Sequence, residues 1–476
     1  MLNNQNQNQK MTNYRWVICA LLFFATTVNY LDRQVLSLLA PEIQKEFHWD
    51  DNHYGTITAF FSLFYSICML FAGRFVDWMK TKKGFLWAIG IWSVGACIHA
   101  FCGIATSGIL EGKWMVGFTG SKEIIKGISN IALIANTSMG LFIFARAVLA
   151  LGEAGNFPAA IKATAEYFPK RDRAFSTSVF NSGATIGAMV APVCVIPLAN
   201  VFSWEWAFLI IGMLGFIWMG FWIFLYKKPE EHPRVNKAEL AYIHSDRDEV
   251  EVKEEKVSFL QCFKYKQTWS FAFGKFMTDC VWWFLLFWMP KYLGEVYKLS
   301  EPEKILPLTV IYAIVMISLY GGKLPTIIIE KTGKDPYAAR MQAMLIFAFF
   351  PLLILLAQPL GSYSYWIAVV IIGIAGAAHQ SWSANIFSTI GDMFPKKAIA
   401  TITGIGGMAG GISSFIINKG SGKLFVFAET TNLSFLGFQG KPAGYFIIFC
   451  ICSVAYLIGW AIMKSLVPEY KKITDL

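Results

Sequence analysis

The chain has 476 residues, of which 55% are hydrophobic and only 15% are charged. Soluble domains carry about 25% charged residues, so this balance argues against an ordinary soluble protein and favours one of the lipid bilayer. The formal net charge of +10 does not indicate a nucleic-acid partner, because the basic residues form short clusters between apolar stretches and no basic stripe is interleaved with stacking aromatic residues.

A polar tail, residues 1–14, opens the chain; it is rich in Asn and Gln and lacks the basic region of a signal peptide. The apolar stretch behind it runs into Asp32 and Arg33 without a cleavage-like site, so we expect it to remain as a membrane span. Nine cysteines lie mostly in apolar stretches, and none has the C-x-x-C spacing of a metal site. We expect small buried side chains at these positions, no disulfide framework and no metal site.

Apolar blocks of about 20 residues follow, each long enough to cross ~30 Å of hydrocarbon as a helix. They predict twelve spans, at residues 15–40, 54–78, 85–105, 137–158, 174–201, 204–226, 269–292, 305–329, 339–358, 363–389, 397–419 and 443–466. The long hydrophilic stretch at residues 227–268 separates six spans from six. The sequence therefore predicts an all-α membrane protein of two six-helix halves, residues 15–226 and 269–466, with a solvated linker between them and a tail at 467–476.

The basic clusters lie on one side of the predicted spans, in the loops at residues 80–83, 170–173, 331–340 and 396–397. Loops rich in Lys and Arg remain in the cytoplasm, so both termini and the linker are expected there. Residues 106–136 form a loop on the outer side that is longer than its neighbours and too polar to span. The simplest interpretation is a tolerated surface insertion, and we assign it no role.

Functional residues are expected where ionisable groups occupy apolar spans, since each such charge costs ~2.5–3.5 kcal/mol on insertion scales. In the first span, Tyr30 and Arg33 share a helix face with Asn29, whereas Asp32 projects about 100° away. The charges of this span must face a polar cavity or an opposite charge.

The fourth span carries Arg146 and Glu153, which are two helical turns apart and share one face. Two interpretations fit the four charges of the first and fourth spans. Asp32 and Glu153 carry protons while Arg33 holds an anion, or the four form two salt bridges that only lock the helices together.

The seventh span contains Lys275 and Asp279, four residues apart. They either neutralise each other or leave Lys275 as a second cation for a substrate carboxylate. The tenth span places four polar side chains in an apolar helix, which predicts a lining that recognises hydroxyl groups, although a lone buried histidine is more often simply hydrogen-bonded. These four residues are His379, Gln380, Ser383 and Asn385.

The loop between the second and third spans reads GRFVDWMKTKKG. Gly73 permits close approach of helices, Asp77 lies at a helix end, and basic residues follow from Lys80. We predict a charge latch on the inner face, which makes this segment a gating element and not a substrate site.

The same segment resembles the signature of this loop in the major facilitator superfamily, with a glycine, an aspartate four residues later and then basic residues. Other segments look like the hexuronate transporter branch of the anion:cation symporter family. They are NYLDRQVLS, ARAVLALGEAGNFPAAIKATAEYFPKRDRA, WAFLIIGMLGFIWMGFWIFLYKKPEEHP, GKFMTDCVWWFLLFWMPKYL and AAHQSWSANIFSTIGDMFPKKAIATITGIGGMAGG. The likeness covers nearly the whole chain except residues 106–136 and the N-terminal tail.

This resemblance implies uptake of glucuronate or galacturonate across the cytoplasmic (inner) membrane by alternating access. Protons are the coupling ion, no other cofactor is implied, and such proteins work as monomers in lipid. The resemblance places substrate between the halves, on Tyr30, Arg33 and Tyr65. It assigns proton coupling to Asp32 and Glu153, with Arg146 as their partner. Lys275 stands where some relatives have a neutral amide, which favours an acidic substrate.

Three alternatives remain open at this point. In the first alternative, the substrate of the transporter is another small carboxylate, such as the aldonate galactonate. Alternatively, the chain is a membrane sensor that binds a sugar acid, although residues 227–268 and 467–476 are too short and charged for a signalling domain. An intramembrane enzyme is the weakest alternative, because the HEXXH and GxSxG motifs are missing and a Lys/Asp pair specifies no reaction.

Overall fold

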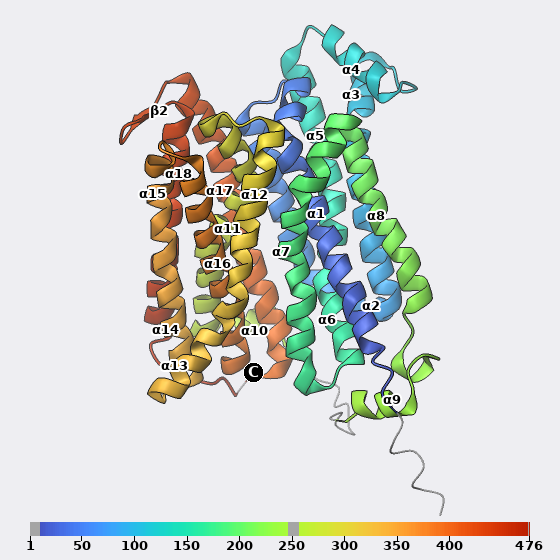
Figure 1. The fold of residues 1–476 in the computed structure, drawn as a ribbon, viewed down its shortest axis with the longest axis vertical. Helices are drawn as coiled ribbons and strands as arrows, with labels where there is room; N and C mark the ends of the chain where they lie inside the picture. Colours follow the sequence, from blue (N-terminus) through green and yellow to red (C-terminus); the bar gives the residue numbers. More distant parts are fainter. Residues whose placement is uncertain (1–9, 246–256, 475) are drawn as a thin grey trace, which may run out of the picture.

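The computed structural model describes residues 10–245, 257–474 and 476, and these form two bundles of long helices side by side (Figure 1). The first bundle contains α1 (Arg15–Phe47), α2 (Asp51–Ala100), α3 (Cys102–Glu111), α4 (Phe118–Gly127), α5 (Ile131–Glu153), α6 (Asn156–Tyr167), α7 (Lys170–Val201) and α8 (Trp204–Leu225). The short 3-10 helix η1 (Pro229–Glu231) and helices α9 (Lys237–Ile243) and α10 (Phe259–Cys262) connect the bundles.

The second bundle begins with α11 (Lys266–Tyr297), α12 (Glu301–Val315), the 3-10 helix η2 (Met316–Lys323) and α13 (Leu324–Thr332). It continues with α14 (Pro336–Phe349), the 3-10 helix η3 (Phe350–Leu353), α15 (Ile354–Gly361), α16 (Tyr365–Met393) and α17 (Lys396–Thr430). A small antiparallel hairpin, β1 (Ser434–Phe435) and β2 (Phe438–Gln439), leads into α18 (Lys441–Leu466).

Within the described residues, nine helices or runs of helices are long and apolar enough to cross a membrane. One of them is α2, whose backbone breaks at Lys80 (φ 64°, ψ 158°), so it comprises two spans. α1 and α11 complete the twelve, although both carry charged side chains at mid-helix. The twelve predicted spans are therefore helical over most of their length, with breaks at Phe101 and at residues 154–155. Most of the helices extend beyond the predicted spans, since polar helix ends continue outside the hydrocarbon.

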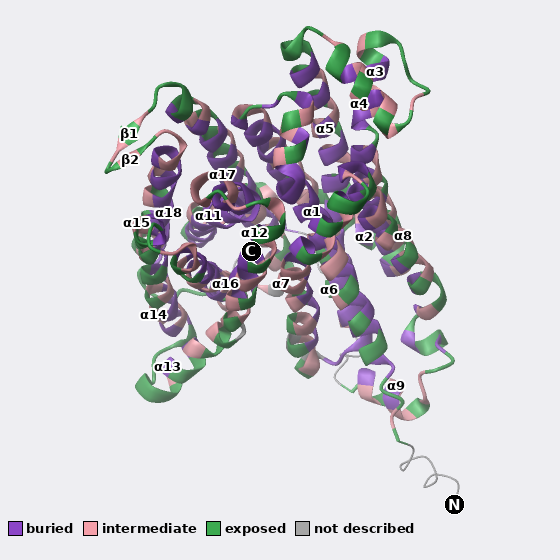
Figure 2. Ribbon diagram, turned by 45° about the horizontal axis from the view of Figure 1, so that its top comes forward, coloured by how far each residue is buried: buried purple, intermediate pink, exposed green. Residues whose placement is uncertain are grey.

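Exposed residues lie on the outside of both bundles, and buried residues gather between the helices (Figure 2). Many of the exposed side chains are large and hydrophobic. The exposed set includes Phe24, Phe71, Phe144, Ile217 and Phe224. Soluble monomers rarely expose contiguous apolar surface on this scale, whereas lipid contact requires it.

The predicted outer insertion, residues 106–136, is more ordered than a simple loop. It contains the end of α3, all of α4 and the start of α5. The α4 side chain Lys122 forms ion pairs with Glu46 of α1 (3.4 Å) and Glu205 of α8 (3.1 Å), and Trp204 donates to Glu46 at 2.8 Å. The insertion therefore joins the ends of two spans.

The predicted solvated linker is docked over part of its length. Glu239 of α9 is fully buried and accepts hydrogen bonds from the backbone N–H groups of Tyr14 (2.9 Å) and Arg15 (3.0 Å). Its carboxylate also pairs with the Arg15 guanidinium at 3.2 Å. The linker thus caps the start of α1, where helical N–H groups lack partners. Residues 246–256 of the predicted linker and 1–9 of the predicted tail lie outside the described residues.

The start of α1 and the C-terminal end lie at the same end of the molecule, at the bottom of Figure 1, which we name the terminal face. At the opposite end, the far face, ion pairs join the two halves. Asp51 of α2 pairs with Lys291 of α11 (2.5 Å) and Lys441 of α18 (3.0 Å). Tyr54 donates to the Phe287 carbonyl at 2.7 Å. These contacts close the far end.

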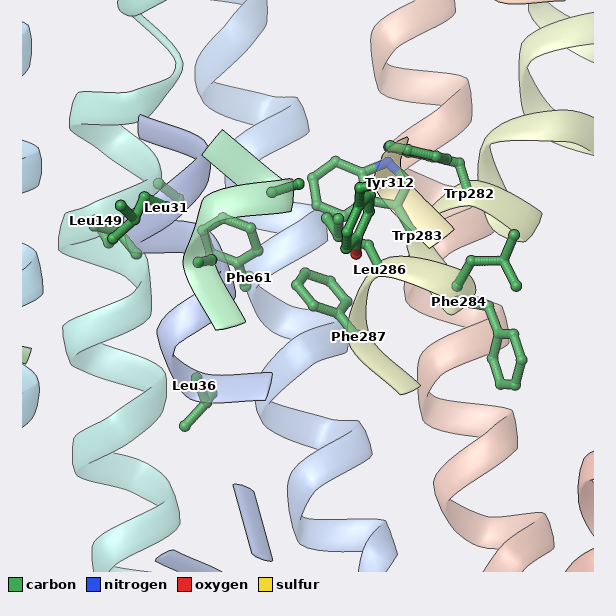
Figure 3. Close-up of a cluster of buried hydrophobic side chains, with 14 of the residues drawn as sticks. Leu31, Leu36, Phe61, Leu149, Trp282, Trp283, Phe284, Leu286, Phe287 and Tyr312 are labelled. Atoms are coloured by element: carbon green, nitrogen blue, oxygen red, sulfur yellow. The ribbon is translucent and has the colours of Figure 1, made fainter. Parts of the chain in front are cut away.

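An aromatic layer lies on the central side of this closure, and part of it is drawn in Figure 3. Figure 3 shows Phe61 of the first half facing Trp283 and Phe287 of the second, and the ring centroids are 6.0 Å apart in both pairs. Tyr312 of α12 joins the layer, and its hydroxyl accepts a hydrogen bond from Gln34 of α1 at 2.5 Å. The layer separates the centre of the molecule from the far face.

We expect Asp51→Asn to shift the protein towards states that are open at the far face. Both ion pairs between the halves lose their acid. Because Glu295 still contacts Lys291 at 3.3 Å and Lys441 at 3.2 Å, the state closed at the far face should be destabilised by only about 1–3 kcal/mol. Spin labels at exposed His48 and Leu436, in a cysteine-free background, should report longer distances between the halves. Glu303→Gln is the control, because the described hydrogen bonds of Glu303 come from Ser300 of the same half; an unchanged distance in Asp51→Asn would contradict the assignment.

Candidate functional site

A cavity of about 280 Å³ lies between the halves, on the terminal side of the aromatic layer. This volume is close to the lower end of the ~300–1,000 Å³ range of small-molecule sites. Side chains from α1, α2, α5, α6, α7, α11, α16 and α17 line it. All six residues predicted to bind substrate are among them, namely Tyr30, Arg33, Tyr65, Lys275, His379 and Gln380.

Arg33 is the buried cation that the first half contributes to the cavity. Its Nη2 and Nε atoms donate to the same oxygen of Glu153, Oε2, at 2.6 and 2.9 Å. Four aromatic rings surround the guanidinium, at 4.7 Å for Tyr30 and Tyr65, 5.1 Å for Trp283 and 5.7 Å for Phe61. Each desolvated cation–π contact contributes up to about 2 kcal/mol, so the rings hold the charge in place.

Asp32 does not line the cavity. This agrees with its predicted position on α1, about 100° away from the face that carries Tyr30 and Arg33. In the described part of the chain, Asp32 Oδ2 and all three guanidinium nitrogens of Arg146 have no hydrogen-bond partner. Arg146 instead lies over the Phe61 ring at 5.0 Å. Among the described residues, one direct ion pair, between Arg33 and Glu153, forms in place of the two salt bridges that the locking alternative expects.

Glu153 is bound to one guanidinium group and lies within electrostatic range of a second. One of its oxygens is bound to Arg33, and the other, Oε1, has no partner among the described residues. Arg146 acts electrostatically on the same carboxylate. A carboxylate with a free oxygen and two neighbouring cations is able to change partners without leaving the site.

Lys275 and Asp279 are the matching charges of the second half. The Lys275 Nζ and Asp279 Oδ1 atoms are 2.8 Å apart, and the ammonium group lies over the Phe387 ring at 4.6 Å. The i,i+4 pair predicted from the sequence therefore forms, and both of its members line the cavity.

His379 shares a hydrogen bond between its Nδ1 atom and the Tyr456 hydroxyl at 2.6 Å. Its ring stacks on Trp282, with centroids 5.0 Å apart and an interplanar angle of 4°. These contacts fit a satisfied hydrogen-bonding histidine that shapes the wall of the cavity. The sequence pattern does not predict a site role for Tyr456 of α18, because a single tyrosine in an apolar span gives no signal.

The remaining polar residues of α16 divide between two faces. Gln380 and Ser383 line the cavity. Asn385 does not, and its amide donates to the Ser381 carbonyl of its own helix at 2.8 Å. Asn156 and Asn181 also line the cavity and were not singled out from the sequence, because isolated asparagines at helix ends or in polar turns are common.

The predicted latch between the second and third spans contains an ion pair between helices. Asp77 pairs with Lys162 of α6 at 2.9 Å, and the chain turns at Lys80, which directs the lysines that follow elsewhere. Lys82 donates to the Ile223 and Tyr226 carbonyls at the end of α8, both at 2.8 Å. A Cβ atom at Gly73 would meet nothing within 4 Å, so the expected close helix approach is absent there.

Known proteins match this chain over most of its length. The hexuronate transporter of Escherichia coli strain K12 is 27% identical over 469 residues, which cover 96% of this chain and 96% of that protein. The galacturonate transporter of Dickeya chrysanthemi is 28% identical over 296 residues, covering 62% of this chain and 76% of that protein.

The fold also matches solved structures. A bacterial homologue of the human lysosomal transporter Spinster, in an inward-facing and occupied conformation, superposes with a TM-score of 0.65 at 17% identity, covering 97% of this chain and 99% of that one. The sequence model described as Major Facilitator Superfamily matches residues 22–417. With twelve helical spans among its described residues and a central cavity, this multi-pass membrane protein belongs to the major facilitator superfamily of transporters.

Proposed function

We propose that this protein is a proton-coupled symporter that carries a hexuronate, glucuronate or galacturonate, into the cytoplasm by alternating access. The central observation is a cavity between the halves with one buried cation from each half, Arg33 and Lys275, each neutralised by an acid of its own half. The names of the relatives, hexuronate and galacturonate transporters, support the substrate class.

The geometry suggests how an anion and a proton are coupled. A substrate carboxylate that binds Arg33 must replace Glu153, because both seek the same guanidinium. The released Glu153 carboxylate is then buried with a weaker partner, which favours the uptake of a proton. Arg146 provides an alternative partner for Glu153, and Asp32 is the second acid within reach of this exchange.

The hydroxyl groups of the sugar ring would contact the polar wall of the second half. Gln380 and Ser383 offer donors and acceptors, and Trp282 and Trp283 provide ring faces. In this proposal the protein works as a monomer in the inner membrane, and its terminal face is cytoplasmic, as the basic loops predict. The far-face closure then holds the protein in an inward-facing state. The Asp77–Lys162 pair, Gly73 and Lys80 then belong to the cytoplasmic gate.

Uptake into proteoliposomes of the purified protein tests this function. Labelled glucuronate and galacturonate should accumulate when the outside is acidified, and a protonophore should abolish the accumulation. Galactonate tests the aldonate alternative in the same assay. Accumulation that ignores the pH gradient would contradict proton coupling.

Substrate affinity should depend more on Arg33 than on Lys275. Arg33→Lys replaces a planar fork with a point charge and should weaken glucuronate binding tenfold or more, since charged hydrogen bonds contribute ~1.5–3 kcal/mol. Lys275→Gln should weaken binding by less than tenfold. Calorimetric titration of both variants measures this, and unchanged affinity in Arg33→Lys would exclude Arg33 as the anion site.

Coupling should require the acid at Glu153. Glu153→Gln cannot release a proton, so it should abolish accumulation against a gradient while counterflow exchange continues, because exchange moves no net protons. Both are measured in the same vesicles, with Glu303→Gln at the exposed start of α12 as a matched control. If Glu153→Gln still concentrates substrate, Glu153 has a structural role.

A further inference from the structure

The carboxylate of Asp279 is the one acid of the cavity to which neither the coupling mechanism nor substrate binding assigns a role. It lines the cavity beside Lys275, its Oδ1 atom lies 2.8 Å from the ammonium group, and its side chain is only 13% exposed. A lysine held this way offers no free charge to an incoming anion.

The position of Asp279 is supported from a second helix. A Cβ atom at Gly410 of α17 would lie 2.1 Å from Asp279 Oδ2, so the carboxylate rests directly against the glycine backbone. Any larger residue at Gly410 would push the carboxylate away from this position. The α17 backbone therefore leaves space for Asp279 beside Lys275.

The two halves of the cavity repeat one arrangement. In the first half an arginine, Arg33, is bound by Glu153, and in the second half Lys275 is bound by Asp279. Both pairs line the same cavity, and Tyr30 of the first half lies within electrostatic range of Asp279. An anion that bridges the halves meets an internal carboxylate at both ends.

We propose that Asp279 is a specificity-determining residue that competes with the substrate carboxylate for Lys275, so that Lys275 becomes a full anion subsite only when Asp279 is displaced or neutralised. This inference rests on the proposed sugar-acid function and adds the residue that sets the charge of the second half. It explains why a buried lysine and a buried acid are both directed into a cavity that is expected to admit an anion. A pair needed only to lock α11 would not have to face the cavity.

The test is a double-mutant cycle on the full-length protein in nanodiscs, read by calorimetric titration with glucuronate and, as the neutral counterpart, glucose. Asp279→Asn should bind glucuronate about tenfold more tightly, which corresponds to ~1.4 kcal/mol, because the competitor has lost its charge. Asp279→Glu keeps the carboxylate and is the matched control. Lys275→Gln should cost more affinity in the Asp279→Asn background than in wild type.

Gly410→Ala provides a second variant with Asp279 itself intact. It should displace the carboxylate and tighten glucuronate binding in the same direction, by a smaller factor. Equal or weaker glucuronate binding in both Asp279→Asn and Gly410→Ala would overturn the proposal, as would an additive cycle. Parallel loss of glucuronate and glucose binding would also overturn it, because Asp279 would then hold the sugar hydroxyls. The hexuronate assignment fails separately, if wild type binds neither glucuronate nor galacturonate.

Discussion

The ion pair between Arg33 and Glu153 neutralises two charges that the membrane interior would otherwise reject. A charge at the centre of a span costs ~2.5–3.5 kcal/mol on insertion scales, and a buried pair is stable only where hydrogen bonds and geometry compensate for lost hydration. Here one acid of α5 meets one arginine of α1 inside a cage of aromatic rings. Both helices direct these side chains away from lipid and into the cavity between the halves. The cavity is therefore the place where one carboxylate can replace another on Arg33.

The far-face closure also combines ion pairs with aromatic rings, but here the ion pairs join the two halves. The ion pairs of Asp51 with Lys291 and Lys441 join the halves at the far face, and an aromatic layer lies between these ion pairs and the central charges. Aromatic rings from both halves contact one another in this layer, and a low-dielectric layer of this kind strengthens the electrostatic interactions on either side. This closure at the far face agrees with the alternating access proposed above.

Most of the candidate site could be predicted from the spacing of residues along single helices. Tyr30 and Arg33 on one face, Asp32 on another and the Lys275–Asp279 pair all lie as helical periodicity predicts. Contacts between helices did not follow from the sequence. Glu153 pairs with Arg33 and not Arg146, Asp77 pairs with Lys162, and Glu239 caps α1, because partner choice depends on how helices rotate and pack. Composition likewise placed the insertion at 106–136 in solvent, although α4 docks through Lys122.

Charge neutrality limits what this cavity can carry. The groups around Arg33 comprise two guanidiniums and two carboxylates, Arg33 and Arg146 with Asp32 and Glu153, and Lys275 and Asp279 form a second neutral set. An anion entering alone would leave one net negative charge in a low-dielectric site, where uncompensated charge is costly. Protonation of one carboxylate, as in the proposed coupling, would restore neutrality, so charge balance favours at least one proton for each substrate carboxylate. A dianionic sugar acid would need a second neutralised acid, and Asp279 is the carboxylate placed to provide it in the half opposite Glu153.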